Sequence, residues 1–159
     1  FVLPFLFIII IFVYLGAGFE YTQVKHRSML FDYVAKDVVM KDYSVLDAKD
    51  PLKNAVEIML KTQQTGFLVR KDEEVVGILV KDNIIKGLSK HGEDVETGEI
   101  MTEDFQRAEA STPLRDIFQT MQQKKTEILP VFEKDKLIGI IDLENIREFI
   151  LVQTALREQ

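Results

Sequence analysis

Cysteine is absent from this chain of 159 residues, and histidine occurs only twice. Without cysteine the chain can have no disulfide scaffold, no cysteine-based zinc site and no cysteine nucleophile. Positive charge is also limited: 20 basic residues face 26 acidic ones, and no basic stripe offsets the net charge of −6. This charge balance argues against nucleic acid as a partner. A chain of this length forms one compact domain or two small ones.

The motifs of common catalytic sites are missing as well. His26 and His91 are far apart, and neither belongs to the His-Glu-x-x-His sequence that places two imidazoles on one helix face for zinc. No serine lies in a Gly-x-Ser-x-Gly sequence. Gly77 and Gly139 lie between apolar residues and outside any phosphate-binding loop, which predicts close approach of backbone within a strand. We therefore expect no enzymatic activity and no metal site in this chain.

Charge is missing from residues 1–19 (FVLPFLFIIIIFVYLGAGF), although it is frequent in the rest of the chain. A helix over Phe1–Gly18 would be about 27 Å long, close to the ~30 Å hydrocarbon core of a bilayer. We expect the end of a transmembrane helix here. A signal peptide would have a basic n-region, and a buried core helix would need a larger apolar partner surface.

The chain begins with Phe rather than Met, so we expect it to be the tail of a longer protein. Lys25, His26 and Arg27 follow the apolar run, and basic residues beside a membrane helix favour the cytoplasmic side; a solvated helix surface would also explain them. Residues 20–34 continue with helical periodicity, which predicts a helical linker between the membrane and the remainder of the chain.

An internal repeat organises that remainder, because residues 51–84 resemble residues 113–146 at an offset of 62. Upstream, Val39-Met40 matches Ile100-Met101 at an offset of 61, which predicts one inserted residue. The aligned pairs are Pro51/Pro113, Leu52/Leu114, Met59/Met121, Val69/Val131, Gly77/Gly139, Ile78/Ile140, Asn83/Asn145 and Ile84/Ile146.

Each repeat predicts the same local structure. Asp50-Pro51 and Thr112-Pro113 are typical helix starts, with a capping oxygen followed by Pro at the first helical position. Two apolar runs around a charged turn, at 71–74 or 133–136, then predict a β-hairpin. A closing helix follows in both repeats, from about 81 to 90 and from about 143 to 156. The order strand, helix, strand, strand, helix therefore occurs twice, and the chain is α/β.

The motifs V-V-M-K-D…D-P-L…M…F-L-V…V-V-G-I-L and E-I-M-T-E…T-P-L…M…L-P-V…L-I-G-I-I-D resemble a tandem pair of cystathionine-β-synthase (CBS) domains. The resemblance covers about residues 35–155, with repeat 1 over 35–92 and repeat 2 over 97–156. It implies two βαββα repeats related by a pseudo-twofold axis, with their sheets back to back. It also implies a regulatory module that forms a homodimer, and many members of the family bind adenine nucleotides between the repeats.

Residues 6–30, which lead directly into the repeats, resemble the C-terminal part of site-2-type intramembrane zinc metalloproteases, whose last membrane helix ends in a similar Gly-Ala-x-x-Glu-Tyr stretch. This resemblance implies a location at the cell membrane, with residues 1–19 in the lipid bilayer and the CBS pair in the cytoplasm. The catalytic zinc would then belong to a protease part outside this sequence. The alternative parent is a membrane transporter or channel whose CBS pair is a regulatory or scaffold module without a small ligand.

The family's nucleotide site usually carries Ser/Thr-x-x-Asp after the last strand, with the hydroxyl near phosphate and the Asp on the ribose. The matching stretches here are Val80-Lys81-Asp82-Asn83 and Asp142-Leu143-Glu144-Asn145, and both depart from that pattern. Alternatively, Asp142 simply caps the closing helix. If a ligand binds, the resemblance implies that the better cleft is beside the strand starting at Ile128. The candidate ligand-binding residues are Asp142, Asn145, Thr126, Asn83 and Thr65.

Finally, the helices over 52–60 and 114–121 have broad apolar faces in a short chain with a limited core. We expect these faces to associate in a symmetric dimer. Two hypotheses about the module stay open at this stage. It senses a ligand and passes a change of angle between the repeats to the membrane part, or it dimerises the parent protein and binds nothing small.

Overall fold

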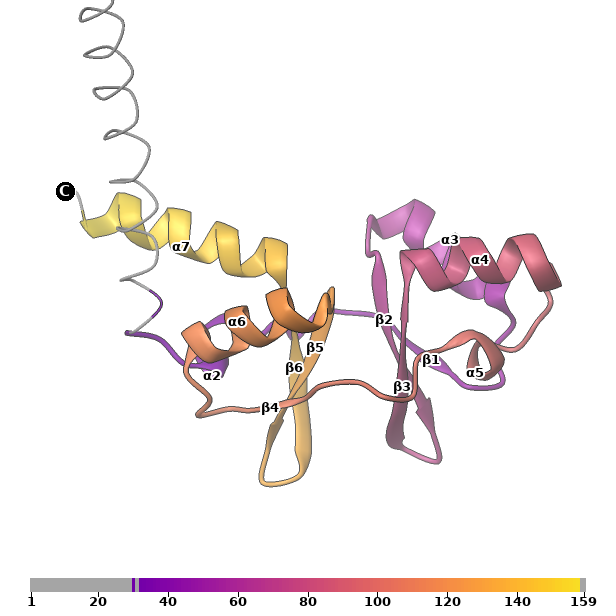
Figure 1. Ribbon diagram of the computed structural model, residues 1–159, viewed down its shortest axis with the longest axis horizontal. Coiled ribbons are helices and arrows are strands. Elements are labelled where there is room, and N and C mark those ends of the chain that lie inside the picture. The colour runs from indigo at the N-terminus through magenta and orange to yellow at the C-terminus, as the bar shows by residue number, and fades with distance from the viewer. Residues whose placement is uncertain (1–29, 31, 158–159) are drawn as a thin grey trace, which may run out of the picture.

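The computed structural model describes Leu30 and residues 32–157, and it contains two three-stranded sheets, ordered β1-β2-β3 and β4-β5-β6. The sheets stand side by side, and the long helices lie away from the two hairpin turns (Figure 1). In each sheet the first strand is parallel to the second, and the second and third form an antiparallel hairpin. The predicted α/β pair of repeats is therefore confirmed.

The bounds of the elements follow the same order in both repeats. Repeat 1 contains α2 (Ala35–Val38), β1 (Val45–Asp47), α3 (Leu52–Thr62), β2 (Gly66–Lys71), β3 (Glu74–Val80) and α4 (Lys81–His91). Repeat 2 contains α5 (Thr97–Ile100), β4 (Ala108–Glu109), α6 (Leu114–Lys124), β5 (Ile128–Glu133), β6 (Lys136–Asp142) and α7 (Leu143–Arg157). The short helices α2 and α5 were not predicted, because four residues are too few to show a helical period.

The leading segment of each repeat crosses to the sheet of the other repeat. The Met40 N–H donates to the Ile140 carbonyl at 2.8 Å, and the Ile140 N–H donates back at 3.0 Å. Thr102 makes the corresponding pair of bonds with Ile78 of β3, at 2.8 and 3.0 Å. Each sheet therefore gains one bridge from a segment that belongs to the other repeat.

These bridges correct the sequence alignment of the leading segments. Met40 and Thr102 occupy equivalent places, so the offset there is 62, as it is between α2 and α5. The predicted offset of 61, which paired Met40 with Met101, is wrong. The Val-Met and Ile-Met dipeptides look alike, but the bridging partners decide the register, and no residue is inserted.

Both strand glycines lie where the crossing segment meets the sheet, which confirms the predicted close approach of backbone. A β-carbon on Gly77 would lie 2.5 Å from the Met101 sulfur. A β-carbon on Gly139 would overlap the Met40 carbonyl oxygen and would lie 2.5 Å from a Val39 methyl carbon. A β-carbon at position 139 would press on the backbone of the crossing segment, whereas one at position 77 would press first on the Met101 side chain.

The predicted capping of α3 and α6 is wrong in detail. Pro51 and Pro113 are the N-cap residues rather than the first helical residues, and neither helix has a side-chain cap. Asp50 instead accepts a hydrogen bond from the Asp47 N–H at 2.8 Å, and Thr112 accepts one from the Glu109 N–H at 3.0 Å. These side chains point toward the N-terminal side, away from the helix, because they stabilise the turn that follows the preceding strand.

The hairpin turns contain two residues each, fewer than predicted, because the strands extend to Lys71 and Glu133. Asp72 and Glu73 both have positive φ, at 50° and 68°, and Lys134 and Asp135 have φ of 50° and 63°. Positive φ at both central residues matches the twist of a tight hairpin, although glycine or asparagine is more usual there.

Apolar residues form one core in each repeat and a third core between the two sheets. The third core contains Leu68, Ile78, Ile128 and Ile140, which explains why the sheets pack back to back. The apolar faces of α3 and α6 that were expected to mediate dimerisation lie largely inside these cores. Leu52, Leu114 and Met121 are fully buried, and Ile117 nearly so, whereas Leu60 is 76% exposed.

The predictions for the N-terminal region fall mostly outside the described residues. The predicted transmembrane helix over 1–19 lies entirely outside them. Within Leu30 and 32–157, no helix has both the length and the apolarity needed to cross a bilayer. The predicted helical linker over 20–34 is wrong at its end, because Asp32–Val34 are not helical and Val34 forms a bridge with Pro113.

Candidate functional site

The start of α7 holds two of the candidate residues. Asp142 is the last residue of β6 and is paired with Ile128, the first residue of β5. Its carboxylate accepts a hydrogen bond from the Asn145 backbone N–H at 2.6 Å. Asp142 therefore caps α7, as one of the two interpretations of the sequence predicted. A role of the same carboxylate toward a ligand stays a prediction.

The start of α4 is stabilised in the opposite way. Val80 has no side chain that could cap, and the Asn83 side-chain oxygen accepts a hydrogen bond from the Val80 N–H at 3.3 Å. Equivalent asparagines in the two repeats thus have different surroundings. The Asn83 oxygen is bonded within its own turn, whereas the Asn145 side-chain oxygen is buried and has no partner among the described residues.

An unbonded buried oxygen costs about 1–3 kcal/mol in desolvation, so such an atom points to an unmet donor. The hydroxyl of a small ligand could provide that donor. Asn145 is therefore the candidate residue whose geometry is best suited to bind something, while Asn83 is occupied by its own helix.

Both candidate threonines lie at the same end of the sheets as the helix starts. Thr126 is partly buried and precedes β5, and its N–H donates to the Met121 carbonyl at 3.0 Å. Thr65 is exposed and precedes β2. The starts of these two strands touch, because a β-carbon on Gly66 would lie 2.5 Å from an Ile128 methyl carbon.

Glu127 was not predicted as a site residue, although it lies between Thr126 and Ile128. Burial raises the pKa of its carboxyl, the negative charge of Asp82 raises it further, and Lys81 lowers it. The segment before β5 in repeat 2 therefore lies beside the start of α4 in repeat 1. The internal repeat in the sequence could have predicted this arrangement. Two repeats related by a pseudo-twofold axis bring the strand starts of one repeat to the helix starts of the other.

The charges at this end of the sheets are mostly negative. The Asp82 carboxylate raises the pKa of Glu127 and Lys81 lowers it, while the Asp142 carboxylate caps the neighbouring helix. Carboxylates repel phosphate groups unless a cation intervenes. The arrangement disfavours an anionic group placed directly against these carboxylates.

A cleft of about 540 Å³ opens at the other end of the sheets, between the two hairpins. Tyr43, Arg70 and Lys134 are among its lining residues, and none of the five candidate residues lines it. Burial raises the pKa of Tyr43. The repeat 2 equivalents of two lining residues, Val45 and Arg70, are Arg107 and Phe132. The Arg107 guanidinium lies over the Phe132 ring, with its carbon 5.4 Å from the ring centroid. The two faces of the pair therefore differ at the hairpin end.

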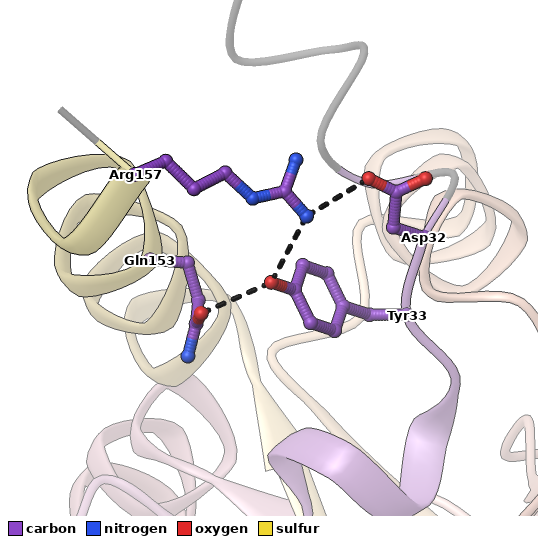
Figure 2. A network of polar contacts seen from close by, with 4 residues as sticks. All are labelled: Asp32, Tyr33, Gln153 and Arg157. Atoms are coloured by element: carbon purple, nitrogen blue, oxygen red, sulfur yellow. Dashed lines mark hydrogen bonds and ion pairs between the residues drawn. The ribbon is translucent and has the colours of Figure 1, made fainter.

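The last turn of α7 is joined to the segment where the described chain begins (Figure 2). The Tyr33 hydroxyl donates to the Gln153 side-chain oxygen at 3.0 Å. The Arg157 guanidinium donates to the Asp32 carboxylate at 3.0 Å and to the Tyr33 oxygen at 3.4 Å. The Tyr33 ring also packs edge-on against Phe149, with centroids 4.8 Å apart.

We call this group, Asp32, Tyr33, Gln153 and Arg157, the junction. It was not predicted, because its two halves are more than 100 residues apart in sequence. The part of the chain that the structure describes contains no cluster of three or more His, Asp or Glu side chains that could hold a metal ion.

Comparison with solved structures supports the fold. CBSX2 in complex with AMP is 25% identical, with a TM-score of 0.67, and the match covers 77% of this chain and 98% of that one. The CBS domain pair of protein MJ0100, in complex with 5′-methylthioadenosine and S-adenosyl-L-methionine, is 20% identical with a TM-score of 0.68, covering 76% and 98%. A hemolysin-like protein containing a CBS domain, from Oenococcus oeni, is 19% identical with a TM-score of 0.68, covering 79% and 95%.

Comparison with curated proteins gives no match. A model of the CBS domain, in contrast, matches twice, over residues 35–90 and 97–152. These two ranges hold the two βαββα repeats and together span well over half of the chain. The chain therefore belongs to the CBS domain family, of which it carries a tandem pair.

Proposed function

We propose that this CBS pair is the cytoplasmic regulatory module of a membrane-embedded zinc metalloprotease of the site-2 type, and that it senses an adenine-containing ligand. The uncharged run over residues 1–19, placed directly before the pair, supports the membrane context. The AMP complex of CBSX2, at 25% identity, supports the ligand class. The pair itself is not expected to catalyse a reaction.

One observation carries the sensing proposal: the buried and unbonded side-chain oxygen of Asn145 in the first turn of α7. The same helix ends at the junction, where Gln153 and Arg157 contact Tyr33 and Asp32. A helix of 15 residues is about 22 Å long and moves as a rigid rod. A ligand that tilts the start of α7 would therefore displace the segment that leads to the membrane.

Sensing also requires that the ligand bind the two arrangements of the pair with different affinity. The electrostatic interaction of Glu127 with Asp82 and Lys81 at the start of α4 depends on the angle between the repeats, because these groups belong to different repeats. A ligand bound between the repeats would contact both of them, so its affinity would also depend on the angle between the repeats.

The test is calorimetry on the whole chain in detergent micelles with adenosine, AMP, ADP, ATP and S-adenosylmethionine. We expect weak binding of adenosine or AMP. Asn145→Ala should weaken it about fivefold, the equivalent of one neutral hydrogen bond. Asn83→Ala is the matched control and should leave affinity unchanged, because its oxygen is bonded to Val80.

A second variant tests the charge argument. Asp142→Thr restores a hydroxyl at the position where the family usually has one, and it should strengthen binding of AMP. If Asp142→Thr leaves the affinities for AMP and ATP unchanged, the assignment of this cleft is wrong and Asp142 only caps α7. If none of the five compounds binds, the sensor proposal fails and the scaffold hypothesis is favoured.

We also propose that the pair dimerises, through the exposed end of the apolar α3 face first expected, together with an exposed residue of α4. Leu60 on α3 and Ile85 on α4 are 76% and 51% exposed. Their equivalents in repeat 2 are the polar residues Gln122 and Arg147, so the fold does not need apolar side chains there. Sedimentation of the whole chain should show a dimer at tens of micromolar protein, and Leu60→Gln with Ile85→Arg should dissociate it. A wild-type chain that sediments as a monomer would overturn this proposal.

The protease context has its own test. The gene region upstream of that encoding residue 1 should encode a His-Glu-x-x-His helix and a distant Asp, which together form the zinc site of such a protease. An upstream region that encodes transport helices without this motif would favour the transporter or channel instead.

A further inference from the structure

The outward face of α7 changes character halfway along the helix. Its first half exposes Glu144, Arg147 and Glu148. Its second half exposes apolar residues instead: Leu151, Val152 and Leu156 are 60%, 56% and 59% exposed. We call these three residues, together with the exposed Ala155 between them, the α7 patch. The patch lies on the half of the helix that ends at the junction.

The internal repeat shows that the fold does not require this patch. The residues of α7 and α4 that face the cores match, since Ile146 and Ile84 are both fully buried. At the patch, however, the equivalents of Leu151 and Val152 are Ser89 and Lys90. Isolated exposed apolar residues are common, but an exposed group that the equivalent helix lacks is typical of a contact surface.

The position of the patch indicates what covers it. Arg157 is bonded to Asp32, so the end of α7 is held where the described chain begins. Only residues 20–31 separate Asp32 from the uncharged run over 1–19. Those 12 residues span at most about 40 Å when fully extended and about 18 Å as a helix. A run inserted in a bilayer would therefore hold Asp32, and with it the end of α7, within about 40 Å of the bilayer surface.

From this placement we propose that the α7 patch docks on the lipid surface, with Leu151 and Val152 inserted at the boundary between headgroups and acyl chains. Apolar side chains on a helix that lies in this interfacial region are buried about 5–10 Å. The charged first half of α7 shares this outward face, so the helix would lie tilted, with its C-terminal half nearer the lipid than its first half. The contact rests on the membrane attachment proposed above, and it would fix the orientation of the whole pair relative to the membrane.

The experiment exploits the absence of cysteine, since any single introduced cysteine is a unique labelling site. The whole chain is reconstituted in vesicles of phosphatidylcholine with a minority of phosphatidylglycerol, and flotation shows whether it binds them. Val152→Cys carries an environment-sensitive fluorophore, and the vesicles carry a nitroxide on their headgroups. Lys90→Cys, the equivalent position on α4, is the matched control.

We expect the headgroup nitroxide to quench the probe at position 152 at least about twice as strongly as the probe at position 90, because only the first lies at the lipid interface. A third variant carries the probe at Ala155→Cys and replaces the patch by its α4 equivalents, Leu151→Ser and Val152→Lys. Its quenching should fall to the level of the Lys90 site.

The remaining outcomes separate this inference from the proposal on which it rests. If the chain floats with the vesicles but the probes at 152 and 90 are quenched equally, the membrane attachment stands and the lipid contact is refuted. If position 152 is shielded from aqueous iodide without lipid quenching, and dilution of the protein removes the shielding, a second copy covers the patch and the lipid contact is again refuted. If the chain does not float, both proposals fail together.

Discussion

Replacing Gly139 by Ala should destabilise the protein far more than the equivalent replacement of Gly77. The β-carbon at Gly139 would overlap the carbonyl oxygen of Met40 and would lie 2.5 Å from a Val39 methyl carbon. Backbone cannot rotate away as a side chain can. The crossing segment would therefore have to leave β6, which breaks the two hydrogen bonds between Met40 and Ile140.

The magnitude follows from these contacts. Two backbone hydrogen bonds contribute about 1 kcal/mol each, and the overpacking adds about 1–3 kcal/mol. We expect the free energy of unfolding to fall by about 3–5 kcal/mol in Gly139→Ala on these two counts. At Gly77 the two nearest atoms are the sulfur and γ-carbon of Met101. Methionine repacks easily, so Gly77→Ala should lower the free energy by only about 1–2 kcal/mol.

The assay is urea unfolding of the whole chain in detergent micelles, followed by far-UV circular dichroism, with the midpoint and slope fitted for both variants. A lower midpoint at unchanged slope reports a change in stability alone. If Gly139→Ala loses no more stability than Gly77→Ala, the backbone of Met40 does not lie against β6 and the exchange of segments between the repeats is refuted.

Three further predictions concern local contacts. Asp142→Ala should lower the free energy of unfolding by about 1 kcal/mol because α7 loses its cap, and Asp142→Asn should restore most of it; equal stability of both variants in urea would contradict the cap. Glu73→Gly should raise the free energy by roughly 0.5–1 kcal/mol, because φ is 68° at this turn position and glycine adopts that conformation without strain; a lower urea midpoint would contradict this. Partial burial raises the pKa of the Glu127 carboxyl above its ordinary value of about 4.5, so the folded state holds the proton more tightly and the native protein loses stability as pH rises from about 4.5 through the raised pKa. Glu127→Gln should therefore gain stability relative to the wild type at pH 7 but not at pH 4, and equal urea midpoints at pH 7 would show that folding does not raise the pKa of this carboxyl.

The sequence was sufficient for the regular parts of the fold. Long apolar periods over α3, α6 and both hairpins predicted the elements and their order, because a repeated pattern doubles every local signal. The crossing segments were missed for a physical reason. Each pairs through a single bridge, Met40 with Ile140 and Thr102 with Ile78, and a single bridge leaves no period in the sequence.

The candidate site was predicted less completely. The asparagines at 83 and 145 are identical in sequence, and only their surroundings show that one oxygen is bonded and the other is not. Glu127 is recognised as a site residue only from the structure, which places its charge near Asp82 and Lys81 at the start of α4. The exposure of Leu60 and the burial of Leu114 also depend on packing, since both residues belong to helices with an apolar face.

The exchange of leading segments also has a consequence for the order of events during protein synthesis. Met40 leaves the ribosome long before Ile140, which lies roughly 100 residues further along the chain. At about 5–20 residues per second, its partner strand arrives some 5–20 seconds later. The outer edge of β3 is likewise uncovered until Thr102 has been made. An uncovered strand edge is a site where nascent chains aggregate. We therefore expect a chaperone to protect this protein most during the interval between synthesis of a strand and synthesis of the segment that covers its edge.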